Sequence, residues 1–332
     1  MPTLRQALQT ALDENEGAIP FDLFMGLALH HPEDGYYARH ISSIGPEGDF
    51  TTTPQMGPAL GASVATWVKA TASKLGWKKI PVIECGPGDG SLAKALLENF
   101  GWLARPRIDL HLVETSAPLR AKQKKLLRWH RVRWHPDIAT ALVACRGRAL
   151  IYHNEFFDAF PCRVFASSSL GWEEEYLQVR GKVLEETFQT PRRSLPPSTS
   201  LDQVWPEGQR IEVFASVREW MHKLATTWEE GAMLTIDYGG TSQSIYHRRP
   251  SGTLRAYRDQ QRFIGKEILA CPGRQDITAE VNFDDLELWA KELGWRLGPN
   301  IPLSDFFSVE APPHLTDREG AGRAFRCLTF SP

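Results

Sequence analysis

The sequence predicts an α/β fold whose sheet is mostly parallel and is covered by helices on both faces. From about residue 80, short apolar runs alternate with segments of helical spacing, which is typical of such a sheet. The first of these runs ends in an acid and is followed by three closely spaced glycines. The 332 residues, 42% hydrophobic and 23% charged, can bury the core that the fold needs.

The elements are predicted in chain order from the spacing of apolar residues. Before residue 80 we expect helices at 4–13, 21–31 and 58–76, with a structured loop rich in Gly, Pro, Thr and aromatic residues between the second and the third. After it we expect strands at 80–84, 108–114, 132–134, 149–153 and 232–237. The accompanying helices are expected at 91–100, 117–129 and 211–228, and the tail adds one more helix and the last strands.

The alternation fails once, between about residues 160 and 210. This stretch predicts two or three antiparallel strands followed by an exposed, turn-rich connection, "TPRRSLPPSTS". We interpret it as an insertion that forms a flap beside the site. The predicted division is an N-terminal helical segment with its loop at 1–78, and a main domain at 79–332 that carries the insertion.

Composition limits the classes of function. A net charge of −2 gives no overall attraction to nucleic acid, and no apolar run approaches the roughly 20 residues that span a bilayer. Five scattered cysteines, without CxxC pairs or Cys/His clusters, indicate a reducing compartment and no metal. Because the N-terminus has neither a long apolar segment nor a basic amphipathic one, we expect a cytoplasmic protein without nucleic-acid or membrane partners.

The glycine loop "GPGDGS" decides between two kinds of nucleotide ligand. A dinucleotide fingerprint needs its third glycine one place later than Gly90, and Asp89 lies where a pyrophosphate would approach. NAD-dependent oxidoreduction is therefore disfavoured. A nucleoside ligand without phosphate suits Glu84, Gly86, Pro87, Gly88 and Gly90 better, and S-adenosylmethionine is such a ligand.

Polar side chains also follow the next three strands. Glu114 comes after "LHLV", where a carboxylate can accept both ribose hydroxyls, although NAD enzymes carry an acid there too. Asp137 and Ile138 follow the third strand and offer an adenine hydrogen bond and an apolar contact, while a solvated turn acid is an equal interpretation of Asp137. Asn154 ends the fourth strand. The carboxyl ends of parallel strands share one edge, so these residues predict a single binding site.

At these residues the chain resembles the MidA-type (DUF185) S-adenosylmethionine-dependent methyltransferases, which include a mitochondrial complex I assembly factor that methylates arginine. The matching segments run from residue 34 to residue 287 and include "DGYYA", "GDFTTTPQMGPALG", "ECGPGDGSLAKALL", "HNEFFDAFPCRVF", "LTIDYGG", "GTLRAYR" and "DITAEVNFDDLE". The family usually has an acid where this chain has Gln55.

The resemblance implies a Rossmann-like class I methyltransferase: a mostly parallel seven-stranded sheet, an N-terminal helical segment that closes over the cofactor, and a subdomain inserted between strands four and five. It implies S-adenosylmethionine as cofactor and a protein arginine as methyl acceptor. It does not decide the oligomeric state, and a homodimer is one of the alternatives. It also implies that the loop Gly48–Pro54 lines the cofactor pocket, with Asp49, Phe50, Thr51, Thr53 and Pro54.

Methyl transfer needs an aligned nucleophile and exclusion of water rather than a metal. A guanidinium acceptor would be held by carboxylates, and Glu155 and Asp158, with Asn154 beside them, are the predicted catalytic residues. Asp158 would also suit a cap of the helix or turn that begins at Ala159. Asp237 and Tyr238 end the fifth strand and form a second polar pair on the same edge.

Two other functions remain open from the residues. A small-molecule methyltransferase would have a deep, closed pocket. A non-catalytic assembly or scaffold factor would bind the cofactor for stability and recognise its partner through the insertion.

Overall fold

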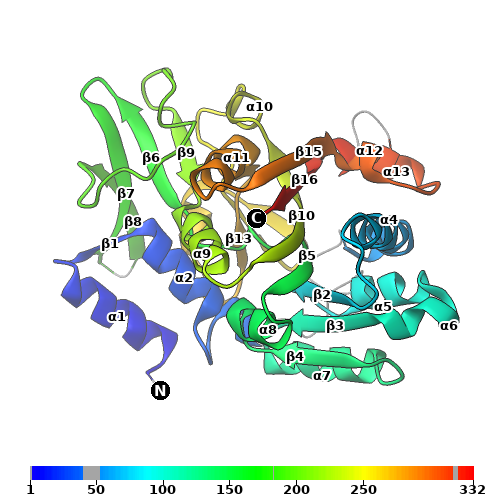
Figure 1. Cartoon of the computed structure of the whole chain (residues 1–332). Helices are drawn as coiled ribbons and strands as arrows, with labels where there is room; N and C mark the ends of the chain where they lie inside the picture. Colours follow the sequence, from blue (N-terminus) through cyan, green and yellow to red (C-terminus); the bar gives the residue numbers. More distant parts are fainter. Residues whose placement is uncertain (1, 40–52, 182, 317–320) are drawn as a thin grey trace. The chain divides into compact units, whose positions relative to one another are not determined.

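The computed structural model describes residues 2–39, 53–181, 183–316 and 321–332, with some side chains in these ranges excepted (Figure 1). The chain divides into two compact units, each described by itself below. Unit 1 comprises Met1–Ser43, Phe157–Glu219 and Gly239–Leu288. Unit 2 comprises Ile44–Phe156, Trp220–Tyr238 and Trp289–Pro332.

Unit 2 contains the parallel sheet. Five parallel neighbours lie in the order β4 (Val132–His135), β3 (Ile108–Val113), β2 (Ile80–Cys85), β5 (Arg148–Asn154) and β10 (Glu230–Gly240). Next to β10 come the antiparallel strand β16 (Phe325–Ser331) and then β15 (Arg296–Pro302). The last two residues of β10, Gly239 and Gly240, belong to unit 1, where they pair with β14 (Val281–Asn282). With β14 counted, the described residues give eight strands where seven were expected.

The sheet of unit 2 is accompanied by helices. They are α4 (Thr53–Lys74), α5 (Ser91–Glu98), α6 (Gly101–Ala104), α7 (Ala117–Leu126) and α8 (Ile138–Ala144), with the short α12 (Leu303–Phe306), α13 (Pro313–Thr316) and α14 (Ala321–Ala324) near the end of the chain. Of these, α4, α5 and α7 were predicted from the apolar spacing and the shorter ones were not. Val64, Val68 and Leu96 are fully buried in one core with Val82 of β2. Helices α4 and α5 are so close that a Cβ on Gly61 would lie 2.4 Å from the Cβ of Ala95. This packing fixes α5, and with it the glycine loop that precedes the helix.

Unit 1 begins with α1 (Leu4–Glu14), α2 (Phe21–His30) and α3 (Tyr36–Arg39). An antiparallel sheet follows the order β1 (Ala18–Pro20), β7 (Gly171–Arg180), β6 (Arg163–Ser168) and β9 (Arg210–Val213), with β8 (Val183–Gln189) also paired to β7. A second sheet has the order β12 (Gln261–Phe263), β11 (Arg255–Arg258) and β13 (Asp276–Thr278). The remaining helices near these strands are α9 (Ala215–Ala225), α10 (Ser242–Tyr246) and α11 (Phe283–Glu292). The antiparallel strands expected around 160–210 are therefore present.

Three details differ from the predictions. The helix expected at 211–228 starts only at Ala215, because the residues before it pair with β6 as β9. The connection expected to be exposed is partly buried, since Ser198 donates a hydrogen bond to Asp285 and Asn282 donates one to Ser200. The units also do not follow the predicted boundary at residue 78, because α4 packs in the core of unit 2. In the described residues, no helix is both long and apolar enough to cross a membrane.

Candidate functional site

The glycine loop joins β2 to α5 through a backbone that favours glycine. Gly86, Gly88 and Gly90 have φ values of +63°, +55° and +88°. A Cβ on Gly86 would lie 2.9 Å from Cδ2 of Phe156, so a side chain there would be both strained and crowded. Asp89 accepts a hydrogen bond of 2.8 Å from the backbone N–H of Ser91 at the start of α5. The acid that argued against a pyrophosphate thus has a local role in shaping the loop.

Glu114 lies directly after β3 and is 7% exposed. Its Oε1 accepts from the backbone N–H of Ser116 at 2.8 Å, and its Oε2 accepts from Gln123 Nε2 at 3.1 Å. Burial raises the pKa of this carboxyl, and the hydrogen bonds from Ser116 and Gln123 oppose that rise. Each carboxylate oxygen can accept a second hydrogen bond, so a fixed Glu114 can still receive two hydroxyl groups.

Gln123 is a residue of this site that the sequence did not reveal. It is fully buried on α7, and its Nε2 donates to the carbonyl of Gly88 at 2.7 Å as well as to Glu114. Its Oε1 accepts from the indole N–H of Trp134 at 2.9 Å. One side chain therefore joins the glycine loop, the acid after β3 and strand β4. Its only signal in the sequence was an uncharged residue among the lysines of the 117–129 helix.

Asn154 and Glu155 stand at the carboxyl end of β5. Asn154 is 8% exposed, and its Oδ1 is buried without a hydrogen-bond partner in the described part of the chain. Its Nδ2 donates to Glu155 Oε1 at 3.1 Å, and Tyr238 Oη donates to Glu155 Oε2 at the same distance. Glu155 has φ +51°, a left-handed conformation that is uncommon for this residue type and is often found at functional sites.

The turn after Glu155 is fixed by the end of β10. Asp237 is fully buried, and its carboxylate accepts from the backbone N–H groups of Phe156 at 3.2 Å and Tyr238 at 3.0 Å. The ring of Phe156 lies beside Gly86 of the glycine loop. The same ring packs against the ring of Trp220, and the two ring centroids are 5.7 Å apart. The loop after β2, the turn after β5 and the end of β10 therefore meet at one edge of the unit 2 sheet.

Four predicted cofactor residues have other contacts in the structure. Glu84 is 2% exposed and accepts a hydrogen bond of 2.7 Å from Tyr152 Oη, and burial raises its pKa to about 8. Asp137 is exposed and caps α8, where its Oδ1 accepts from the backbone N–H of Thr140. Ile138 is the buried first residue of that helix. Pro87 lies in the glycine loop and accepts from the N–H of Gly90.

Asp158 belongs to unit 1, whereas Glu155 and Asn154 belong to unit 2. It lies in a turn that includes Ala159, and no helix begins there, so of the two alternatives for its cap only the turn is present. Its Oδ2 accepts from Thr278 Oγ1 at 3.0 Å, and Tyr37 donates to the neighbouring Asp276 at 2.9 Å. Strands β11 and β13 thus bring part of "DITAEVNFDDLE" beside "GTLRAYR" in unit 1.

The loop predicted to line the cofactor pocket lies mostly outside the described residues. Asp49, Phe50 and Thr51 lie outside the described residues, as does Gly48. Thr53 and Pro54 form the first turn of α4, but their side chains are also outside the description. Among the residues that are described, no group of three or more His, Cys, Asp or Glu side chains could hold a metal ion.

A family profile described as "Putative S-adenosyl-L-methionine-dependent methyltransferase" matches residues 59–299, which is more than half of the chain. The chain belongs to this family. It is therefore an S-adenosylmethionine-dependent methyltransferase, which confirms the predicted enzyme class and cofactor. The match includes the glycine loop, Glu114, Gln123 and Asn154, so the geometry above lies within the family's shared region.

Relatives in the family carry a more specific name. The chain is 28% identical to the mitochondrial protein arginine methyltransferase NDUFAF7 of Danio rerio, over 85% of this chain and 71% of that protein. It is 25% identical to the protein of the same name from Homo sapiens, over 86% and 68%. Because these relatives are named as mitochondrial, they contradict the prediction of a cytoplasmic location.

Solved structures show the same fold. A Burkholderia thailandensis protein crystallised with S-adenosyl-homocysteine has a TM-score of 0.87 to this chain at 24% identity, and covers 99% of this chain and 92% of its own. A second structure from that organism, without that ligand in its name, has a TM-score of 0.84 at 25% identity. The fold is therefore that of methyltransferases, which confirms the predicted fold class at this general level.

Proposed function

We propose that the chain transfers a methyl group to a guanidinium nitrogen of arginine in a protein partner. The observation that carries the proposal is the carboxylate of Glu155, held by Asn154 and Tyr238 on the edge of the sheet that also bears the glycine loop. A fixed carboxylate can bind a guanidinium by two hydrogen bonds and stabilise its positive charge. The names of the relatives support an arginine as the acceptor.

The residues of unit 2 fit the cofactor of this family. Glu114 offers two carboxylate oxygens for ribose hydroxyls, and Asn154 offers a buried amide oxygen without a protein partner in the described residues. The glycines keep side chains away from the space beside the loop. We extend the proposal to Asp137 and Ile138 at the adenine end, and to the loop Gly48–Pro54. When bound, S-adenosylmethionine supplies an electrophilic methyl group on a sulfonium.

The protein's own contribution is to position the acceptor. Tyr238 and Asn154 each donate to a different oxygen of Glu155, so this carboxylate has a defined orientation before an acceptor arrives. The buried carboxylate of Asp237 fixes the backbone of the same turn. Glu155 can then accept from the guanidinium and direct one nitrogen away from the carboxylate. Asp158 remains a candidate for a catalytic role, but the proposal is carried by Glu155 alone.

We also infer that the sheet corresponds to the seven-stranded sheet of class I methyltransferases, with β14 as an addition. The order of strands in unit 2, with β16 antiparallel beside β10, supports this inference. The strands β6 to β9 lie in the chain between β5 and β10, and we assign them to the inserted subdomain.

The decisive experiment compares transfer with cofactor binding in Glu155→Gln. Protein extract from cells that lack this protein serves as the acceptor, with radiolabelled S-adenosylmethionine, and amino-acid analysis identifies the methylated product. We expect the wild type to produce methylarginine. In the variant, the rate of methyl transfer should fall by about 100-fold or more, because the amide cannot balance the guanidinium charge. Binding of S-adenosylhomocysteine should change by less than about threefold.

Two controls separate this function from the others. Tyr238→Phe removes one donor to Glu155 and should reduce transfer by about tenfold, without a change in cofactor affinity. Label in another amino acid or in a small molecule would contradict arginine as the acceptor. Cofactor binding without any transfer would favour the scaffold function.

A further inference from the structure

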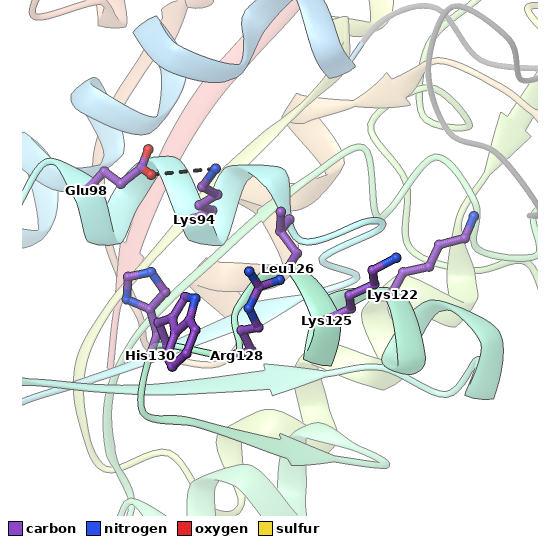
Figure 2. A pocket seen from close by; sticks show the side chains of 8 residues that line it. Lys94, Glu98, Lys122, Lys125, Leu126, Arg128 and His130 are labelled. Atoms are coloured by element: carbon purple, nitrogen blue, oxygen red, sulfur yellow. Dashed lines mark ion pairs between the residues drawn. The ribbon is translucent and has the colours of Figure 1, made fainter.

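A groove with a strongly basic lining lies on the surface of unit 2, between α5 and the end of α7. We call it the basic groove. It encloses about 480 Å³ and is lined by Lys94, Glu98, Lys122, Lys125, Leu126, Arg128, Trp129 and His130. Figure 2 shows these side chains and the ion pair of 3.7 Å between Lys94 and Glu98. The lining thus has four lysine or arginine side chains and a single carboxylate.

The charge of this surface is local. The whole chain has a net charge of −2, yet no acid occurs between Glu114 and Asp137, while seven lysines and arginines do: Arg120, Lys122, Lys124, Lys125, Arg128, Arg131 and Arg133. Burial and the nearby charge of Arg105 lower the pKa of His130, so that side chain is neutral at pH 7. The basic groove therefore presents a concentrated positive field to a ligand.

The buried face and the outer face of helix α7 have different contacts. Leu119 and Gln123 are buried, and the second of them holds the glycine loop and Glu114. Lys122, Lys125 and Leu126 line the basic groove on the outside. The outer residues are consequently not required for the contacts that position the cofactor site.

The basic groove also has an apolar anchor. Trp129 is 83% exposed and Leu126 is 36% exposed. The guanidinium of Arg128 lies 5.3 Å from the centroid of the Trp129 ring, which limits the conformations of that ring. Tryptophan is enriched where binding energy is concentrated in interfaces, and here the ring lies among cations in a groove.

We propose that the basic groove docks an acidic, amphipathic segment of a protein partner. Carboxylates of the segment would pair with Lys125 and Arg128, and its apolar side chains would cover Leu126 and Trp129. A nucleic-acid strand fits this lining less well, because Glu98 would repel a continuous row of phosphates and three of the four cations are lysines rather than the arginines suited to bidentate phosphate binding. The proposal concerns binding, so it does not depend on methyl transfer.

The test uses the full chain with a fluorescein-labelled helical peptide in which glutamates and leucines occupy opposite faces. Fluorescence anisotropy at near-physiological salt measures its affinity. We expect saturable binding that falls about tenfold or more in Lys125→Glu with Arg128→Glu, because two attractive charges become repulsive. The matched control is Lys78→Glu with Lys79→Glu, which changes the net charge equally at exposed positions outside the groove and should retain the affinity.

The anchor is tested in the same assay. Trp129→Ala should weaken the peptide about tenfold, whereas Trp102→Ala, which removes a tryptophan that is 78% exposed on α6, should not. Binding of S-adenosylhomocysteine by each variant confirms that unit 2 is folded. Absence of saturable binding, or equal loss in groove and control variants, would overturn the proposal. Tighter binding of oligouridylate than of the peptide would overturn it in favour of nucleic acid.

Discussion

Glu84 and Glu114 are acids at the ends of two neighbouring parallel strands, but they have different surroundings. Glu84 is paired in register with Leu112, two residues before Glu114, so it lies deeper in the sheet. It bonds to Tyr152 within the core. Glu114 lies just beyond the last pair of β2 and β3, where Ser116 and Gln123 hold its two oxygens. Both carboxyl groups have raised pKa values because both are buried.

The comparison teaches that an acid near a strand end is not by itself a ligand-binding residue. The register of the strand decides how far the side chain lies from the edge, and the hydrogen-bond partners decide which way it is held. Tyr152 directs Glu84 into the apolar core, whereas the backbone N–H of Ser116 holds Glu114 at the edge. We therefore expect Glu114 to contribute to cofactor binding and Glu84 to stability.

The largest expected effect is on cofactor affinity in Glu114→Ala. The variant loses the carboxylate that would accept two hydroxyl groups, and charge-assisted hydrogen bonds of this kind are among the stronger ones. We expect the affinity for S-adenosylhomocysteine to fall by about 100-fold or more, measured by calorimetry. Glu84→Gln, which retains an acceptor for Tyr152, should change the affinity by less than about threefold. An equal loss in the two variants would contradict the distinction between these acids.

The parts of the site that the sequence predicted depend on simple rules. A parallel sheet collects its strand ends at one edge, so Glu114 and Asn154 could be placed there from their positions alone. The contact of Tyr238 with Glu155 could not, because it joins strand ends 83 residues apart and depends on the left-handed backbone at Glu155. Nothing in the helical spacing of 117–129 indicated that Gln123 would be its buried polar residue.

The fold shows the same division. Of the strands from 80 to 154, β2, β3 and β5 were predictable because each is rich in apolar residues and mostly buried, as parallel strands inside a sheet are. The strand β4 is only partly buried and was predicted from Val132 and Trp134 alone. The start of the 211–228 segment was predicted as helix because Ile211 and Val213 fit either spacing, and only pairing with β6 decides for a strand. Likewise, the burial of Ser198 depends on Asp285, which lies 87 residues away.

A second prediction sharpens the role of the contacts that hold Glu114. Gln123→Glu preserves shape, but an ionised carboxylate cannot donate to Gly88 or to Glu114 and adds a like charge beside the latter. We expect cofactor affinity at pH 8 to fall by about 30-fold and to recover as the pH is lowered and the new acid takes up a proton. Calorimetry with S-adenosylhomocysteine between pH 6 and pH 8 would measure this.

Gln123→Leu is the matched control for that experiment. It loses the same hydrogen bonds but has no group to titrate, so its affinity should be reduced at every pH. If Gln123→Glu and Gln123→Leu had the same pH profile, Gln123 would contribute only packing. If both bound as tightly as the wild type, the link between α7 and the glycine loop would have no effect on binding.

The last prediction concerns the pH dependence of stability in Glu84→Gln. Burial raises the pKa of Glu84 from 4.5 to about 8, so the folded protein retains a proton that the unfolded chain releases. The stability that this proton contributes is fully present below pH 4.5 and is lost as the pH rises toward 8, by at most about 1.4 kcal/mol per pH unit. Urea unfolding from pH 5 to pH 8 measures the free energy of unfolding of both proteins, and the difference between wild type and variant should change with that slope. Taking the difference removes the contribution of other buried acids such as Glu175, which remain in both proteins. A difference that does not change with pH would mean that Glu84 is ionised in the folded protein, and would move it back to the group of ligand-binding acids with Glu114.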